Sequence, residues 1–375
     1  MIYTVPDYYK EFHCLADKCE DTCCAGWQIV IDKKSLAKYR NIAGAFRKRM
    51  KKSVDWKNST FKQSEDKRCA FLNENNLCDM QLALGEKSLC KTCRRYPRHV
   101  EEFENVREIT LSLSCPEVAR ILLNKKEQVK LLSVEKEEEE EYEDFDPFLY
   151  SELVEAREVM RKILQDRSKE IRIRAGLILG LAHDMQIRIN RGEMFTCEEV
   201  YLKYQKERAA LFVEERLKER NGDWRKNYQR SWKTFRKLYR LELLREDWDV
   251  HLKETEYLLF GNGAKGYQNI QEEFEDWISE NWKDFSICCE QLLVYFIDTY
   301  FCGAVYDGRA YSKVRMAVVS VFYIYEMLKA RWCKNDKMLD REDVIMIVYR
   351  YSREIEHSDR NLELMERYGR FLEAI

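Results

Sequence analysis

The sequence is poor in helix-breaking residues and almost balanced in charge. Its 375 residues include only four prolines and thirteen glycines, which favours a helix-rich chain. The formal net charge is −2 although 35% of the residues are charged, so composition gives no general case for nucleic-acid binding and we expect none. Hydrophobic residues make up 45% of the chain, which indicates a packed globule rather than disorder.

The sequence also lacks a segment that would direct it to a membrane. Residues 1–14 contain no basic stretch followed by an apolar run, so no secretory signal is expected. The longest apolar stretch, Met316 to Leu328, is too short to span a bilayer and predicts a buried helix. We therefore expect a cytoplasmic protein without membrane contact, in which thiols stay reduced.

Cysteine is the residue type that is unusually concentrated. Nine of the fourteen cysteines lie within the first 115 residues, and three of them fall in the six-residue stretch "CEDTCC". Reduced thiols at such short spacings favour metal ligation over disulfides. Cys19 and Cys23 are four apart, so a helical turn would put both on one face, and Cys90 and Cys93 form a C-x-x-C. The remaining five, Cys197, Cys288, Cys289, Cys302 and Cys333, are expected to be core thiols.

The metal itself stays open from spacing alone. A zinc site usually has four nitrogen or sulfur ligands, and a [4Fe–4S] cluster is usually bound by four cysteines, so nine thiols are more than one site of either kind requires. A redox or catalytic role for the C-x-x-C is a further alternative, although no βαβ pattern surrounds it.

Short strands are expected among these cysteines. "REITLSLSC" alternates as a strand that ends at Cys115, and Pro116 then opens a helix. "CAFLNENNLC" predicts two short strands around an Asn-rich turn, which would bring Cys69 and Cys78 together. "WQIVI" at residues 27–31 predicts another short strand.

The rest of the chain has helical periodicity. A like-charge block at residues 135–147 suggests a division into a cysteine-rich region 1–133, an acidic linker 134–147 and a helical region 148–375. Breaks are expected at 220–224 and 260–266. The second break, "FGNGAKG", contains G-x-G-x-x-G, but the charged segment before it favours an interhelical loop over a cofactor loop. The fold class is mainly α, with a small cysteine-rich α+β region carrying short strands or a hairpin.

Several segments resemble one known family. "FHCLADKCEDTCCAGWQIVID", "RCAFLNENNLC", "LGEKSLCKTCRRYPR", "LSLSCPEVARILL" and "YSREIEHSDRNLELM" resemble the flagellin lysine N-methylases, and the cysteine and "CRRYPR" pattern is shared with broader iron- or zinc-chelating proteins. The resemblance implies methyl transfer from S-adenosylmethionine to flagellin lysines, and an iron–sulfur cluster, with [4Fe–4S] or zinc as the metal. Cys90 is an addition to the family pattern. The radical signature C-x-x-x-C-x-x-C is absent, which argues against a conventional radical mechanism. The implied metal ligands are Cys14, Cys19, Cys23, Cys24, Cys69, Cys78, Cys93 and Cys115.

Two further sets of residues are candidates for the chemistry. A helix through "YSREIEHSDRNLE" would align Arg353, Glu356, His357 and Arg360, and the first three are our candidate catalytic residues, with a structural ion-pair network as the alternative. The arginines of "RRYPRH", Arg94, Arg95 and Arg98, are candidates to bind the donor carboxylate or to offset thiolate charge. The alternative function is a metal-chelating or maturation protein that binds iron or zinc without transferase activity.

Overall fold

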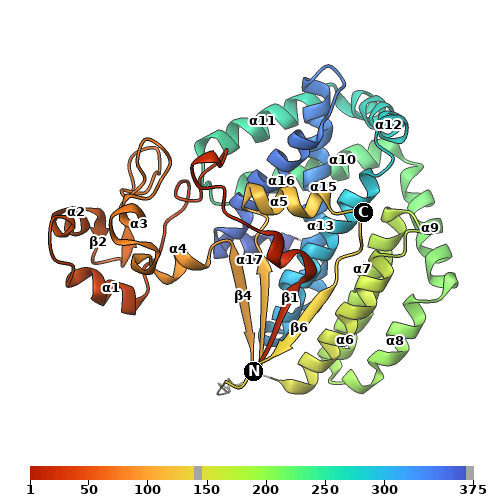
Figure 1. The fold of residues 1–375 in the computed structure, drawn as a ribbon. Coiled ribbons are helices and arrows are strands. Elements are labelled where there is room, and N and C mark those ends of the chain that lie inside the picture. Colours follow the sequence, from red (N-terminus) through yellow and green to blue (C-terminus); the bar gives the residue numbers. More distant parts are fainter. Residues whose placement is uncertain (139–145, 369–375) are drawn as a thin grey trace.

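The computed structural model describes residues 1–138 and 146–368, and this part of the chain is mainly helical, as the composition predicts (Figure 1). Residues 139–145 of the predicted acidic linker lie outside the described residues. The α-helices are α1 Lys33–Arg40, α2 Phe46–Ser53, α3 Asp79–Leu84, α4 Lys91–Arg95, α5 Pro116–Asn124, α6 Pro147–Leu164, α7 Ile171–Arg191, α8 Cys197–Tyr204, α9 Glu207–Asn221, α10 Trp224–Phe235, α11 Glu246–Phe260, α12 Gly263–Asn281, α13 Phe285–Tyr300, α14 Ala304–Asp307, α15 Ala310–Lys334, α16 Arg341–Glu356 and α17 Asp359–Tyr368.

A four-stranded sheet lies against the helices. Its order is β4-β5-β1-β6, where β5 runs parallel to β1 and the other two pairs are antiparallel. Both faces of β5 are largely buried, and its Glu108 carboxylate pairs with the buried Arg157 of α6 at 2.5 Å. The strands are β1 Ile2–Pro6, β2 Val54–Asp55, β3 Thr60–Phe61, β4 Arg98–Phe103, β5 Val106–Leu111 and β6 Leu131–Glu135.

The helical body is built around α13 and α15, whose residues are buried on most sides. The predicted helices over these segments and over α7 are confirmed, and so is the break at 220–224. The break predicted at 260–266 is shorter than expected, because α11 ends at Phe260 and α12 already begins at Gly263. The "GNGAKG" stretch follows helix α11, not a strand, so it joins two helices. Within residues 1–138 and 146–368, one apolar helical run, Phe285–Asp307, is long enough to cross a membrane, but 83% of its most apolar window is buried inside the protein, as in a core helix.

The cysteine-rich lobe, residues 25–97, has a small hydrophobic core of its own. This core gathers side chains from Ile29 to Cys90 around Phe61 and Phe71, and Figure 1 shows the lobe projecting from one side of the molecule. Residues on both sides of the lobe, including Tyr8 and Leu111, belong instead to the large core of the helical body. The two cores therefore divide the chain differently from the predicted boundary at 134–147.

Inside the lobe, the local structure differs from three sequence predictions. Residues 27–31 form no strand and make only a bridge from Val30 to Thr60. Residues 69–78 make the predicted Asn turn, but single bridges replace the two strands. Cys19 and Cys23 do not share a helical turn, because the short 3-10 helix Ala16–Lys18 ends before them and an irregular loop follows.

Candidate functional site

The C-terminal end of α16 carries the predicted catalytic residues. The helix begins with a capping box in which Asp340 and Asp343 accept each other's backbone N–H groups, and it ends at Glu356. His357 is the residue after the helix, and α17 begins at Asp359. The expected single helix is therefore interrupted, and Arg360 is exposed on the second helix instead of joining Arg353, Glu356 and His357.

Glu356 joins the helix to the sheet layer. Its Oε2 accepts hydrogen bonds from the Ser112 hydroxyl, just after β5, and from the Tyr295 hydroxyl of α13 at 2.8 Å. The residue keeps part of its surface exposed, but its Oε1 atom is buried. Burial raises the pKa of Glu356, and the bonds from Ser112 and Tyr295 only partly oppose this rise. A carboxylate with a raised pKa is a stronger base than an ordinary glutamate.

His357 lies beside this carboxylate in a different electrostatic state. Its Nε2 is 3.0 Å from the Ser114 hydroxyl, and its ring stacks on Trp27 with 4.5 Å between centroids. Burial, and then the Arg353 charge, lower the pKa of His357 to about 3. The imidazole is therefore neutral and weakly basic near pH 7, so Glu356 is the better candidate base of the two.

Arg353 fastens the "CEDTCC" loop to α16. Its guanidinium donates to the carbonyl of Ser114 at 2.8 Å and to that of Asp21 at 2.7 Å, and it pairs with the Asp21 carboxylate at 2.7 Å. Arg245 holds the same carboxylate with two bonds of 3.0 Å. The Trp27 indole donates to the Cys23 carbonyl at 2.8 Å, which adds a second attachment. Arg353 therefore positions the cysteine loop rather than offering a free cation.

The clustered cysteines fall into two groups. The loop group consists of Cys14, Cys19, Cys23 and Cys115. The pKa values of Cys19, Cys23 and Cys115 are raised, and the nearby charge of Arg353 opposes this rise. The lobe group lies in and against the lobe core and consists of Cys24, Cys69, Cys78, Cys90 and Cys93.

The thiols within each group act on one another. In the lobe group, the Cys90 thiol forms a hydrogen bond with the Cys93 thiol, with 3.6 Å between the two Sγ atoms. This hydrogen bond lowers the pKa of Cys90 to about 7 and raises the pKa of Cys93. A hydrogen bond also joins the Cys23 thiol of the loop group to the Cys24 thiol of the lobe group, and it lowers the pKa of Cys24 to about 7. The sequence prediction left Cys90 out, whereas the structure puts it next to a predicted ligand.

Metal ligation depends on how these thiols are arranged. Across residues 1–138 and 146–368, no three His, Cys, Asp or Glu side chains already converge on one metal position. The donor type nevertheless suits zinc or an iron–sulfur cluster, because both groups consist of soft sulfur atoms and Arg353 and Arg68 supply compensating charge to Cys24. Ligation would therefore need side-chain rotation, and the choice of ligands stays a prediction.

The three candidate donor-binding arginines do not act together. Arg94 and Arg95 are exposed at the end of α4. Arg98 lies on β4, where its Nε donates to the Tyr9 hydroxyl at 2.8 Å and its guanidinium lies over the Tyr9 and Phe12 rings. Arg98 is thus engaged with the N-terminal segment.

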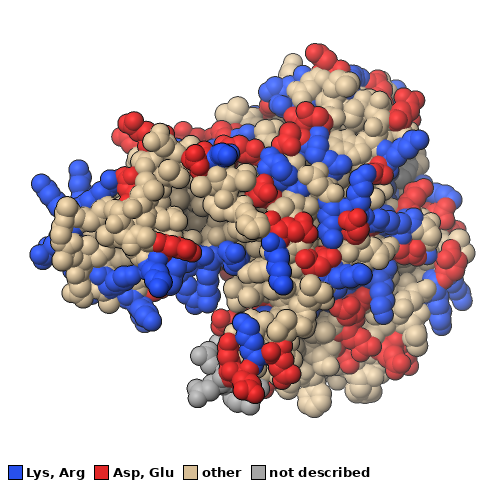
Figure 2. All heavy atoms as spheres, viewed as in Figure 1, with Lys and Arg blue, Asp and Glu red and all other residues tan. Residues whose placement is uncertain are grey.

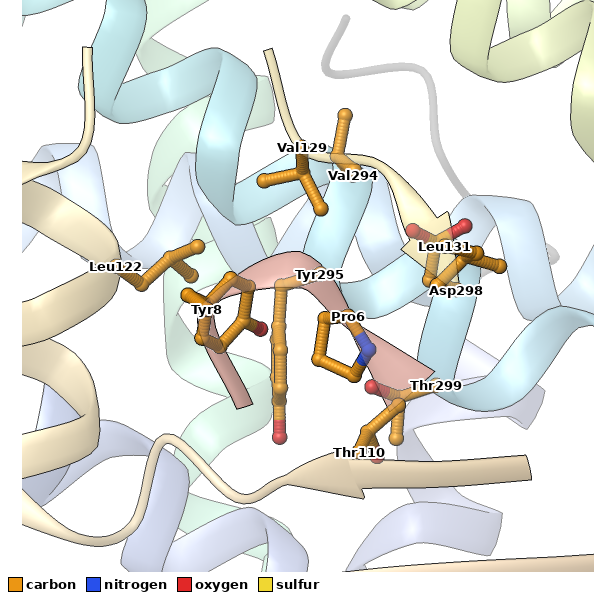
Figure 3. A pocket seen from close by; sticks show the side chains of 10 residues that line it. All are labelled: Pro6, Tyr8, Thr110, Leu122, Val129, Leu131, Val294, Tyr295, Asp298 and Thr299. Carbon is orange, nitrogen blue, oxygen red and sulfur yellow. The ribbon is translucent and has the colours of Figure 1, made fainter. Parts of the chain in front are cut away.

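Two cavities differ in what they could hold. Figure 3 shows a cavity of about 10 Å³ lined by Tyr8, Thr110, Tyr295 and Asp298, which has room for at most one water molecule. A larger groove of about 390 Å³ lies between α11, α15 and α16 and is lined by residues such as His251, Arg331 and Arg350. Its volume falls within the usual range of small-molecule sites, roughly 300–1,000 Å³. Arg245 connects the groove residue Asp247 to Asp21, so the groove borders the cysteine loop.

Sequence reasoning missed several residues of this site. Ser112, Ser114, Tyr295, Trp27 and Asp21 all contact the α16 end or its loop. Ser112 and Ser114 lie in the predicted strand, within three residues of the candidate ligand Cys115, and this position could have indicated that they belong to the site. Nothing in the sequence around Tyr295 distinguishes it from other residues of an apolar helix.

Together these features define a mainly helical protein whose cysteine-rich loop is bonded to Arg353 of α16, on the same helix end as the partly exposed Glu356 and His357. The family model described as the FliB lysine N-methylase C-terminal domain matches residues 157–372, so the chain belongs to this family. The match includes α16 and ends beyond it, whereas the clustered cysteines precede it.

Individual relatives match a shorter stretch. Over 129 residues the chain is 35% identical to the lysine-N-methylase of Salmonella typhimurium, which covers 32% of this chain and 32% of that protein. It is also 35% identical over 129 residues to the flagellar biosynthetic protein FliU of Salmonella muenchen, covering 32% of this chain and 76% of that protein. The match thus spans about a third of the length of the lysine-N-methylase. No solved structure matches the chain.

Proposed function

We propose that this protein is a cytoplasmic lysine N-methyltransferase that acts on flagellin, using S-adenosylmethionine and a cysteine-ligated iron–sulfur cluster. Family membership and the names of the relatives support lysine methylation, and the flagellar names support flagellin as the substrate. The single structural observation that carries the proposal is that Arg353 is bonded both to the cysteine loop at Asp21 and to Ser114, two residues after the serine that holds Glu356, because this joins the two parts of the chain in one site.

The reaction needs a neutral lysine, whose ordinary pKa is about 10.4. Its Nζ attacks the methyl carbon of the sulfonium donor, the carbon–sulfur bond breaks, and the thioether leaves with the bonding electrons. The proton that the lysine loses has to reach a base. Glu356 is our candidate for this role because burial raises its pKa, and Tyr295 and Ser112 fix the orientation of its carboxylate. His357, being neutral, would accept a hydrogen bond without repelling the cationic donor.

For the cluster, the loop group of Cys14, Cys19, Cys23 and Cys115 is the set that Arg353 links to α16. A bound iron–sulfur cluster would supply an electrophilic or redox-active metal beside the site. The chain's own part is to hold the loop in place through Asp21 and Trp27.

For the methyl donor, the groove beside α16 is a better candidate than the predicted arginines. Four of its charged side chains are paired with one another, Arg350 with Asp247 and Lys334 with Glu254. A bound donor would exchange these partners, its carboxylate pairing with the cations and its ammonium group with the anions. Arg94 and Arg95 stay predictions for that role.

The test compares two glutamates near the end of the same helix. Glu356→Gln removes the candidate base, and Glu354→Gln is the matched control, because Glu354 bonds the Leu244 backbone N–H instead of Tyr295. Protein purified without oxygen is incubated with flagellin and labelled S-adenosylmethionine, and the iron content of each preparation is measured. We expect wild type and the control to methylate lysine and Glu356→Gln to lose about 100-fold in rate with its iron intact.

Two results would contradict the proposal. Iron-loaded wild-type protein that transfers no methyl group to flagellin would favour the chelating or maturation role. Equal activity of both variants would remove Glu356 from the chemistry.

A further inference from the structure

The charge of the cysteine-rich lobe is concealed by the balanced composition of the chain. Residues 25–97 contain 17 Lys and Arg against 7 Asp and Glu, a net charge of +10. Since the whole chain has a net charge of −2, the other residues together carry −12. Figure 2 shows this separation, with Lys and Arg gathered on the projecting lobe and both signs mixed over the helical body.

The lobe presents these cations to solvent instead of neutralising them. Fifteen of its basic residues are exposed, against four of its acidic residues. Other acids of the lobe serve its structure: Asp32 caps α1 and also accepts the Lys91 N–H, Asp55 closes a turn, and Asp79 pairs with Arg49. A bound metal with four thiolates would remove only part of this positive charge.

Helix α2 has a high density of exposed positive charge. Arg47 and Lys51, like Lys48 and Lys52, are exposed and four residues apart, so their like charges repel across one turn of the helix. The eight-residue helix contains no acidic residue that would relieve this repulsion. An arrangement that opposes the stability of its own helix is expected where the charge has an external use.

The surface fits a protein better than a nucleic acid. Single strands of DNA or RNA are bound on surfaces that combine cations with aromatic stacking platforms. The strongly exposed large apolar residues in the lobe are aliphatic, namely Val30, Leu82 and Leu84, with no aromatic side chain among them. Two of them, Leu82 and Leu84, lie on α3, and α1 lies beside the segment that follows α3, because Lys38 donates to the Lys87 carbonyl and Tyr39 to that of Ser88. Apolar contacts bordered by charge are typical of protein interfaces.

We propose that the basic surface of the lobe, centred on α2, docks an acidic face of the substrate protein and so presents its lysines to the site on α16. This inference rests on the proposed function. Attraction over the whole lobe would raise the rate of encounter and orient the substrate, while the methyl-transfer step itself would not depend on it.

The test removes four charges from α2 and four from elsewhere. The α2 variant carries Arg47→Gln, Lys48→Gln, Lys51→Gln and Lys52→Gln. The matched control carries Lys206→Gln, Arg208→Gln, Lys233→Gln and Lys283→Gln, four exposed cations of the helical body with the same loss of charge. Binding of flagellin is measured without a methyl donor, and KM and kcat are measured with flagellin and with a short lysine peptide that has no acidic residue.

We expect the α2 variant to raise the Kd and the KM for flagellin about tenfold at low salt and to leave kcat unchanged. Its kinetics with the peptide should match those of wild type, and its midpoint of thermal unfolding should be equal or higher because the repulsion in α2 is gone. The control should behave as wild type. The Kd of wild type for flagellin should rise between about 0.05 M and about 0.3 M salt, and the Kd of the α2 variant should rise much less.

Two outcomes would overturn the docking surface, and a third would overturn only the proposed function. Equal loss in the α2 variant and the control would overturn the docking surface. Tighter binding of a short DNA duplex than of flagellin, dependent on α2, would also overturn it and assign the lobe to nucleic acid. If flagellin binds through α2 but wild type transfers no methyl group, the proposed function fails and the docking surface stands.

Discussion

Arg353→Met is the substitution that most directly tests how the cysteine loop is held. Methionine fills a similar volume, but it removes the bonds to the Ser114 and Asp21 carbonyls and the ion pair with the Asp21 carboxylate. The Arg353 side chain is only 4% exposed and that of Asp21 15%, so water replaces little of what is lost. The loop would lose its main attachment to α16.

The size of the effect follows from these contacts. Breaking a buried ion pair by removing one partner costs about 3–5 kcal/mol. Asp21 keeps its two bonds to Arg245, so we expect the lower end of that range, about 3 kcal/mol. Arg350→Met is the control one turn earlier on the same helix. Arg350 pairs with Asp247, whose side chain is 46% exposed, so its loss should cost no more than about 1 kcal/mol.

The assay measures urea unfolding of both variants at pH 7, together with the iron retained after purification without oxygen. We expect Arg353→Met to lower the free energy of unfolding by at least about 2 kcal/mol more than Arg350→Met, and to lose iron while the control keeps it. If both variants lose the same stability, or if Arg353→Met keeps its full stability and iron, the loop is not held by this guanidinium and the reasoning is wrong.

Two further predictions concern the thiols and the pH dependence. Cys23→Ser should lose metal and fold poorly, since ligation and folding are coupled, whereas Cys333→Ser should keep its metal; equal loss in both would indicate general instability. Burial raises the pKa of Glu354 to about 7 from 4.5, so the folded protein binds this proton more tightly than the unfolded chain does. Stability should therefore fall by about 3 kcal/mol as the pH rises from about 4.5 to about 7. Unfolding measured over that window should show a flatter profile for Glu354→Gln, and parallel profiles would contradict the assignment.

The long helices could be predicted from the sequence because their apolar spacing records a face that is buried along the whole helix. This holds for α7, α13 and α15, and the breaks between helices carry Gly and Asn. The local structure of the lobe, where the sequence predicts strands that do not form, could not be predicted in the same way. Residues 27–31 are held by a bridge to Thr60 and by the bond from the Thr92 hydroxyl to the Val30 carbonyl, which are tertiary contacts without a periodic pattern.

The candidate site was predictable in its residue types but not in its geometry. The end of α16 had a readable signal, because the Ser358 hydroxyl accepts the Asn361 N–H and so starts a new helix after His357. That signal would have separated Arg360 from the other three residues. The role of Arg353 had no such signal, since its partners Asp21 and Ser114 are more than 200 positions away in the sequence.

The two thiol groups differ in what they are attached to, and this difference bears on where chemistry is expected. The lobe group is packed in a small core that reaches the α16 site through Trp27, which packs against the core and stacks on the His357 ring. The loop group is bonded to α16 through Arg353 and, by way of the Cys23 carbonyl and Trp27, to the His357 ring. A change in the loop therefore moves groups that contact the candidate base, whereas a change in the lobe core alters the surface that we propose docks the substrate. Metal loss from the loop group should accordingly lower kcat, while disruption of the lobe should raise KM.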